Sequence, residues 1–193
     1  LQFRVYSGAL LSMMDMLTDI QTIVRFFDEG RSGFAWANVA FILSSLFFQL
    51  AMVYTQHHKR GKRALVYESL IVVCLLKPVV DARRVAHGNR PEEHAMFGVA
   101  EELYCTKGAE MFGESIPSSV LQMYALLGAK EMSGDAVFSI FTSTFSIAYS
   151  SSTLSMDLDT DPGKRAITPD FYGYAPGDKR LQVLCLMVVM TMA

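Results

Sequence analysis

The stretch Phe34-AWANVAFILSSLFFQLAMV-Tyr54 decides the fold, because its residues are almost all apolar. A helix needs about 20 mostly apolar residues to cross the roughly 30 Å hydrocarbon core of a bilayer, and this stretch is long enough. Hydrophobic residues make up 51% of the whole chain and charged residues 19%. That balance is too apolar for an ordinary soluble domain. We therefore predict an integral membrane protein built from helices.

Other apolar segments lie on both sides of this stretch. Residues 64–80 are interrupted by Glu68, Lys77 and Pro78, which indicates a helix that enters the membrane and returns to the same side. The chain does not begin with Met, and its last apolar run is too short to span, so we expect a fragment of a longer protein. The predicted fold class is all-α, a polytopic transmembrane helical bundle. It forms a single membrane domain fragment over residues 1–193, with helices at about 8–27, 34–54, 64–80 (re-entrant), 101–127, 136–156 and 181–193 (truncated).

The distribution of Lys and Arg supports the re-entrant segment, because basic residues in short loops favour the cytoplasmic face. If residues 64–80 return to the side from which they came, the basic cluster at 57–63 and the polar loops 81–93 and 157–180 share that face. Only Arg31 and Lys130 then lie in loops on the other side. If residues 64–80 crossed fully, most of the basic loop residues would lie outside instead. The sequence therefore predicts that residues 56–63 and 83–90 are both cytoplasmic.

Two carboxylates lie within the first predicted helix, at Asp15 and Asp19. Because they are four residues apart, they share one face of the helix. A carboxylate at the centre of a bilayer costs about 2.5 to 3.5 kcal/mol, so a pair on one face favours a functional role. The alternative is that they lie near the membrane interface or pair with a basic residue such as Arg25 or Lys107.

A second polar stripe runs along residues 101–127. Its members recur at spacings of three or four, which places them on one side of a helix: Lys107, Glu110, Glu114, Ser118 and Gln122. Pro117 removes one backbone donor and frees the carbonyl of Gly113, which predicts a kink over residues 113–117. A kinked, acid-lined helix can open a polar groove in a membrane. The alternative is an amphipathic helix lying on the membrane surface.

Residues 136–156 form an uncharged segment rich in Ser and Thr. One face of the predicted helix holds hydroxyl residues, namely Ser139, Ser143, Ser146, Ser150 and Thr153. Small hydroxyl side chains let helices approach closely and hydrogen-bond across the interface, so we expect close packing. A hydroxyl track for lipid head groups is the other interpretation.

The chain carries no pattern typical of catalysis, cofactors or metals. Ser115 and Ser118 have no G-x-S-x-G around them, and glycine-rich phosphate loops are absent. The three cysteines are isolated, which indicates free thiols. His57 and His58 stand in a basic loop, and we interpret them as a solvated patch facing anionic lipid rather than as a metal site. We expect no enzyme activity, no catalytic residue, no cofactor, no metal and, at a net charge of −2, no nucleic-acid partner.

Three pieces of the sequence resemble the XK-related family of membrane proteins, some of which scramble phospholipids. Asp15, Thr18, Asp19 and Gly30 resemble the family's first-helix D-x-x-T/S-D pattern and the glycine after that helix. Residues 110–124 resemble its E-x-x-x-E-S-x-P-Q-L-x-L-Q-x-Y signature, with a serine at position 118 where glutamine is usual. Residues 139–149 resemble the Ser-rich helix that follows.

The resemblance implies phospholipid scrambling or lipid translocation along an acid-lined polar path, with membrane phospholipids as partners and no cofactor. It also leaves room for a partner membrane protein, and it implies a multi-pass location in the plasma membrane. The candidate residues of the path are Asp15, Asp19, Glu110, Glu114, Pro117 and Gln122. The residues alone leave two other functions open. One is an ion- or proton-coupled transporter or channel that uses the same carboxylates, and the other is a non-transporting membrane scaffold whose acids are buried pairs.

Overall fold

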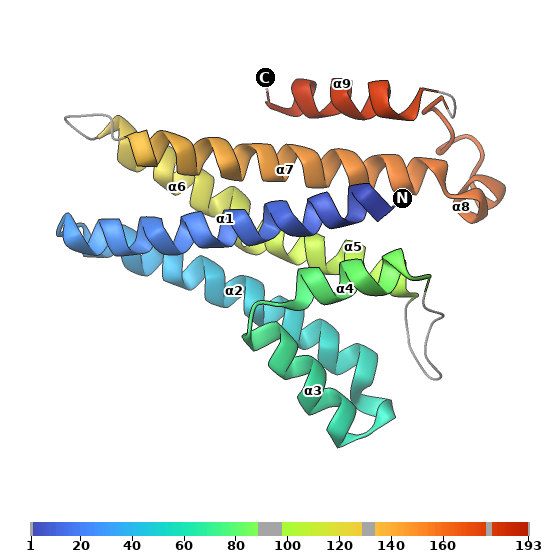
Figure 1. The fold of residues 1–193 in the computed structure, drawn as a ribbon, viewed down its shortest axis with the longest axis horizontal. Coiled ribbons are helices and arrows are strands. Elements are labelled where there is room, and N and C mark those ends of the chain that lie inside the picture. The colour runs from blue at the N-terminus through green and yellow to red at the C-terminus, as the bar shows by residue number, and fades with distance from the viewer. Residues whose placement is uncertain (1, 89–97, 129–133, 177–178, 193) are drawn as a thin grey trace.

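The computed structural model describes residues 2–88, 98–128, 134–176 and 179–192. Within these ranges every regular element is a helix, which confirms the predicted all-α fold class. Figure 1 shows α1 at the middle of the assembly, where it packs against α2, α4 and α7. The fold is therefore organised around its first helix.

Helices α1 (Gln2–Asp28) and α2 (Ser32–His57) form an antiparallel hairpin. Gly30 makes the turn with φ +71°, a left-handed conformation that glycine adopts without a steric penalty. The Arg31 backbone N–H then bonds to the carbonyl of Phe26 at 2.8 Å, and the Arg31 guanidinium lies 5.3 Å from the centroid of the Phe26 ring. This corner fixes the angle between the two helices.

Residues 64–80, expected as one re-entrant helix, belong to two helices. A 3-10 turn, η1 (His58–Arg60), leads into α3 (Lys62–Val73), and α4 (Lys77–Ala86) follows after a sharp turn in which Leu75 has φ +61°. The α4 helix runs back along α1, and Gln2 Nε2 donates to the Ala86 carbonyl at 3.1 Å. The α3–α4 hairpin thus leaves the end of α2 and finishes beside the start of α1 (Figure 1).

The long polar segment forms three consecutive pieces, α5 (Val99–Glu110), the π-helical turn η2 (Met111–Ser115) and α6 (Ile116–Leu127). At the end of η2 the Ile116 backbone N–H bonds to the carbonyl of Met111, five residues earlier. The π-helical turn overlaps the kink predicted over residues 113–117 but begins earlier, at Met111. A wide turn of this kind is rare and often marks a functional site.

The C-terminal part wraps around one side of the bundle. Helix α7 (Gly134–Thr160) lies along α1, the short α8 (Pro162–Ile167) follows, and α9 (Arg180–Met192) packs on the outer side of α7 (Figure 1). A small apolar core holds α9 in place: Ala148, Met156, Leu184 and Val188 are all buried.

Polar residues fill much of the interior, and large apolar residues cover much of the outside. The buried set includes Asp15, Asp19, Asn38, Gln49 and Gln122, whereas the exposed set includes Leu10, Leu17, Leu43, Phe47, Phe112 and Val120. This is the reverse of the arrangement in a water-soluble protein, in which buried polar groups and large exposed apolar surfaces are uncommon. An apolar solvent around the bundle would account for it.

By length and composition, one helix in the described part of the chain, Ser32–Arg60, is suited to cross a membrane. The structure therefore leaves the polytopic arrangement unconfirmed. Helices α1 and α7 have 27 residues each, enough to extend about 40 Å at 1.5 Å per residue. Their length would suffice to cross, but their polar stripes make them less apolar than α2.

Candidate functional site

Asp15 accepts hydrogen bonds from hydroxyl groups on two other elements. Ser115 Oγ, from η2, donates to Asp15 Oδ2 at 2.7 Å, and Ser143 Oγ, from α7, donates to Asp15 Oδ1. Asp15 is only 5% exposed. Through these two hydrogen bonds Asp15 joins α1 to η2 and α7.

Asp19 lies one turn further along α1 and is 1% exposed. Its Oδ1 accepts from Ser118 Oγ at 3.0 Å and from Gln122 Nε2 at 2.9 Å. Ser118 Oγ also lies 3.0 Å from Asn38 Oδ1, which brings α2 into the same group. Asp19 Oδ2, the Asn38 amide nitrogen and Gln122 Oε1 are buried without a hydrogen-bond partner among the described residues. The group therefore keeps spare hydrogen-bonding capacity.

Glu110 has a cationic partner on its own helix. Lys107 Nζ lies 3.2 Å from Glu110 Oε2, and Ser12 Oγ donates to the same oxygen at 2.9 Å. Lys107 Nζ also donates to Ser12 Oγ and to the carbonyl of Gly8. Lys107 and Glu110 thus form a part-buried pair that ties α5 to α1.

The predicted alternative, that the aspartates of α1 pair with Arg25 or Lys107, does not describe the contacts. Arg25 lies 3.6 Å from Glu29, and Lys107 pairs with Glu110. In the described ranges the aspartates take part in no ion pair and are held by hydroxyl and amide donors instead. They are buried acids without a compensating cation.

A small cavity of about 30 Å³ opens beside this group. Its lining includes Asp15, Gln49, Glu110, Glu114 and Ser115, so acids from α1, α5 and η2 face one space. A volume of about 30 Å³ can hold a water molecule. A phospholipid head group does not fit there without movement of the helices.

Gly113 lets η2 approach α2 closely enough to build this region. A Cβ atom at Gly113 would lie 3.0 Å from the Cα of Ser45 and 3.2 Å from its backbone nitrogen. Ser45 is fully buried, and Gln49 Nε2 donates to its hydroxyl at 3.2 Å. Any side chain at this position would require the Ser45 backbone to shift.

The six predicted path residues lie on elements that face each other. Gln122 contacts Asp19 directly, Glu110 and Glu114 share a cavity with Asp15, and Pro117 follows the π-helical turn. Helix α2, which was not among the predicted contributors, supplies Asn38, Ser45 and Gln49. Their spacings of seven and four residues place them on one helix face and could have identified it.

A second buried cluster of charges joins α3, α4 and α5. Lys77 Nζ lies 2.9 Å from Asp81 Oδ1 and 3.5 Å from Glu68 Oε2, and it also pairs with Glu102. Arg84 contributes a second cation, which pairs with Glu68. In the sequence, Glu68 and Lys77 stand out only as interruptions of an apolar segment. The structure instead shows them holding the hairpin to the bundle.

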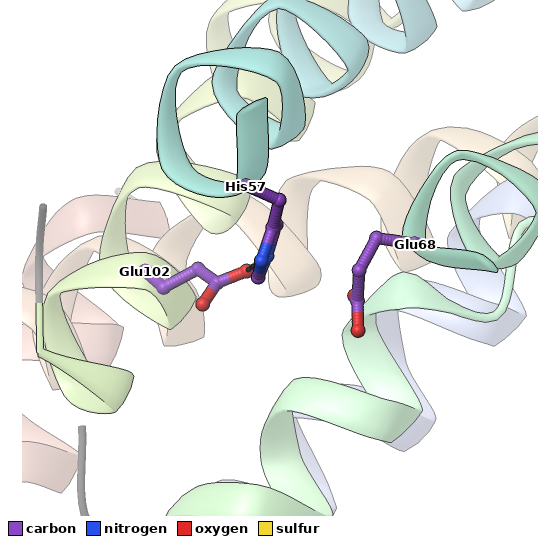
Figure 2. Close-up of side chains that lie close together, drawn as sticks. All are labelled: His57, Glu68 and Glu102. Carbon is purple, nitrogen blue, oxygen red and sulfur yellow. Dashed lines mark ion pairs between the residues drawn. The ribbon is translucent and has the colours of Figure 1, made fainter. Parts of the chain in front are cut away.

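His57 belongs to this cluster, so its interpretation as part of a solvated patch is wrong. It is 3% exposed, with Nε2 3.6 Å from Glu102 Oε1, while Arg60 donates to its Nδ1 at 2.7 Å. Figure 2 shows His57 beside Glu102 with Glu68 nearby, and ligand atoms of the three lie within 4.8 Å of one another. That spacing suits a metal ion. However, the Lys77 ammonium group already contacts both carboxylates and would repel a second cation.

Asp159, at the end of α7, organises the loop that follows. Its Oδ1 accepts from the backbone N–H groups of Gly173 and Tyr174 at 2.8 and 3.0 Å, and its Oδ2 accepts from that of Ala175 at 2.8 Å. Desolvation opposes the effect, but these donors together with Arg165 lower the pKa of Asp159 below its usual value. One carboxylate thus closes the loop between α8 and α9.

A family model described as XK-related protein matches residues 3–165 of the chain. The match runs from α1 to α8 and contains both buried polar groups described above. Searches of curated proteins and of solved structures gave no match. Because the matched residues make up most of the chain and include the acids of α1 and the π-helical turn, this chain belongs to the XK-related family.

Proposed function

We propose that the chain is a multi-pass membrane protein that moves phospholipids between leaflets along its buried polar core. The observation that carries this proposal is the pair Asp15 and Asp19, buried without a cation inside a bundle that exposes many large apolar side chains. Ionisable groups within a membrane segment are rare and usually belong to a transport pathway. Membership of the XK-related family supports a membrane location.

The core groups have the chemistry that a head group needs. The carboxylates of Asp15, Asp19 and Glu114 would attract its amine or choline group, and the hydroxyls of Ser115 and Ser118 would donate to its phosphate. The acyl tails would stay in the surrounding hydrocarbon. No cofactor or covalent step is needed, because the difference in lipid composition between the leaflets drives net movement. We therefore propose a transporter of lipids and not an enzyme.

The path is closed in this conformation, because the cavity beside Glu114 measures about 30 Å³. Opening it requires α1 to separate from η2 and α6. These elements meet through the hydrogen bonds of Ser115, Ser118 and Gln122 to the aspartates. The polar groups of a lipid head group could replace these hydroxyl and amide donors one at a time as the helices separate. A packed apolar interface offers no hydrogen bonds to exchange in this way.

We also propose the topology that this mechanism requires. The α3–α4 hairpin enters and leaves on one face, so that the basic residues near Lys59 and Arg83 are both cytoplasmic. The chain would lie in the plasma membrane, with phospholipids as its partners, room for a partner membrane protein and no nucleic acid bound.

A second function has one observation in its favour. A cavity of about 30 Å³ between carboxylates fits water or a small cation better than a lipid head group. An ion- or proton-coupled transporter or channel would use the same residues as a relay. A scaffold would use them only as structural contacts, as Lys107 and Glu110 already do.

One reconstitution experiment separates these functions. The protein is placed in phospholipid vesicles, and exchange of a fluorescent phospholipid and ion flux are measured in the same preparation. We expect Asp15→Asn/Asp19→Asn and, separately, Glu110→Gln/Glu114→Gln to reduce lipid exchange, because amides keep the shape and remove the charge. Asp170→Asn in the exposed loop is the control for the loss of a carboxylate outside the core.

Thermal stability measured beside exchange tells transport from structure. Glu110→Gln also strands Lys107, and a part-buried cation without its partner would cost up to about 3 to 5 kcal/mol. The single variant Glu114→Gln avoids this, because Glu114 forms no ion pair in the described ranges. Normal exchange in both stable double variants would overturn the lipid path, and loss of ion flux alone would favour the channel.

A further inference from the structure

The contact with Arg60 determines which ring nitrogen of His57 carries the hydrogen. Arg60 Nη1 lies 2.7 Å from His57 Nδ1. A guanidinium group has no acceptor and keeps its protons in proteins, so Arg60 donates and Nδ1 accepts. The hydrogen of the neutral ring is therefore on Nε2. Figure 2 shows the ring pointing toward the carboxylate of Glu102.

This Nε2 donor is buried and lacks a close acceptor. It has no hydrogen-bond partner among the described residues, and Glu102 Oε1 lies 3.6 Å away. That separation is within the distance for an ion pair but beyond the distance for a hydrogen bond. A charged ring would attract the Glu102 carboxylate more strongly than a neutral ring does. A second proton on His57 would therefore gain an electrostatic partner.

His57 belongs to a buried cluster that draws charged side chains from four other elements. Its charged members in the described part of the chain are Arg60 from η1, Glu68 from α3, Lys77, Asp81 and Arg84 from α4, and Glu102 from α5. Three carboxylates and three cations balance while His57 is neutral. A proton on His57 would add a fourth cation, and an uncompensated buried charge is costly. Neutrality returns when one cation leaves.

Arg60 is the cation that a proton on His57 would displace. In a doubly protonated ring Nδ1 is a donor, so it no longer accepts from Arg60 and instead meets an N–H group of like charge. Arg60 is half-buried and lies in the short turn η1. Gly61 follows with φ +104°, and a Cβ built there would meet nothing within 4 Å. The backbone beside Arg60 therefore has room to move.

We propose that His57 is a proton-binding site that releases Arg60 in acid and loosens the turn between α2 and α3. Histidine is the side chain that ordinarily changes charge between about pH 5 and 8. At the upper end of this range the neutral ring holds Arg60, and η1 leads into a first turn of α3 in which the Leu65 backbone N–H bonds to the Gly61 carbonyl at 3.2 Å. At the lower end the charged ring pairs with Glu102. The inference does not depend on what the bundle transports.

The protonation state of His57 can be read from nitrogen NMR of the full chain in nanodiscs, with isotope-labelled histidine. The variant His57→Gln identifies the signals of this ring by their loss. We expect an unprotonated Nδ1 and a protonated Nε2 at about pH 8, and two protonated nitrogens at about pH 5. The opposite tautomer at the higher pH, or a ring that stays neutral at the lower pH, overturns the proposal.

Hydrogen exchange at the Leu65 amide reports the release of the turn. After correction for the intrinsic effect of pH, its protection should fall roughly tenfold between about pH 8 and pH 5, the effect of losing one charge-assisted hydrogen bond. His57→Gln keeps an acceptor that cannot take up a proton, so its protection should not depend on pH. His58→Gln replaces the exposed neighbour and should behave as the wild type does.

The variant Arg60→Gln tests the other partner and serves if His57→Gln does not fold. Without the guanidinium there is no cation to expel, so protection at Leu65 should again be independent of pH. Thermal unfolding of each variant is recorded beside exchange. An unchanged protection in the wild type, or a fall of the wild-type size in Arg60→Gln or in folded His57→Gln, would show that His57 does not control this turn.

Discussion

Gly113 lies in the π-helical turn η2 and is the residue at which this turn contacts α2. Replacing it with alanine places a methyl group 3.0 Å from the Ser45 backbone, which cannot move aside as a flexible side chain could. We expect Gly113→Ala to destabilise the protein by about 1 to 3 kcal/mol through overpacking. Thermal unfolding in detergent would measure the loss.

Gly108→Ala is the matched control, since a Cβ there meets nothing within 4 Å. Alanine favours a helix over glycine by about 1 kcal/mol, so this variant should be as stable as the wild type or more stable. An equal loss of stability in both variants would show that the close approach to Ser45 has no energetic weight.

Lys77 is the residue that balances the second buried cluster. Its ammonium group pairs with Glu68, Asp81 and Glu102, and without it Arg84 would still pair with Glu68 and Asp81. Breaking a buried ion pair typically costs about 3 to 5 kcal/mol, so Lys77→Met should fold poorly. Yield of folded protein and its melting temperature would be compared with Lys62→Met on the exposed side of α3.

A double variant distinguishes charge balance from packing. If unpaired acids cause the loss, adding Asp81→Asn to Lys77→Met should restore part of the stability. No recovery, or additive losses, would mean that the Lys77 hydrocarbon chain matters more than its charge.

At the scale of elements, the loop after α7 depends on the ionised carboxylate of Asp159. Its pKa is lowered in the folded chain, so its contribution to loop stability is complete above the usual aspartate pKa of 3.8 and is lost as the pH falls through the lowered value. We expect faster amide hydrogen exchange at Gly173–Ala175 in Asp159→Asn at neutral pH.

The wild-type loop should approach the exchange rates of Asp159→Asn only in acid, once intrinsic rates are corrected for pH. Asp170→Asn lies in the same loop and should leave the protection of Gly173 and Tyr174 unchanged. Equal protection in Asp159→Asn and the wild type would mean that the three N–H bonds do not order the loop.

The elements differ in how far their sequences determine them. Local periodicity is enough to predict some features. The apolar residues of α2 predict a helix, and the four-residue spacing of Asp15 and Asp19 predicts that they share a helix face. Pro117 indicates a break but not its form, since a kink and a π-helical turn share that signal. Glu68, Lys77 and Glu102 meet only after folding, at separations that no helical period relates. Their pairing could not be predicted from spacing.

At the scale of the whole molecule, the α3–α4 hairpin predicts that two basic regions share one face of the membrane. We expect cysteines introduced at Lys59 and at His87 to react with an impermeant reagent from the same side, in a chain lacking Cys74, Cys105 and Cys185. Of the predicted cytoplasmic loop 83–90, residues 89 and 90 lie outside the described ranges, so His87 is the better probe.

Asp28 is the last residue of α1, and the end of α4 near His87 lies beside the first residues of α1. A cysteine at Asp28 should therefore react only from the membrane face opposite to that of Lys59 and His87, and it serves as the control. Labelling of Lys59→Cys and His87→Cys from opposite faces would contradict the re-entrant hairpin. It would also reverse the orientation of every helix after α4.

The π-helical turn at Met111–Ser115 holds one residue more than an α-helical turn would. If its amides changed acceptors from the fifth to the fourth preceding residue, α6 would rotate by about 100° around its own axis, the angle that one residue spans in an α-helix. Ser118 and Gln122 would then move away from Asp19 together, and a different face of α6 would lie against α1. The π-helical turn therefore permits a one-residue shift that would open the contact between α6 and α1 without unfolding either helix.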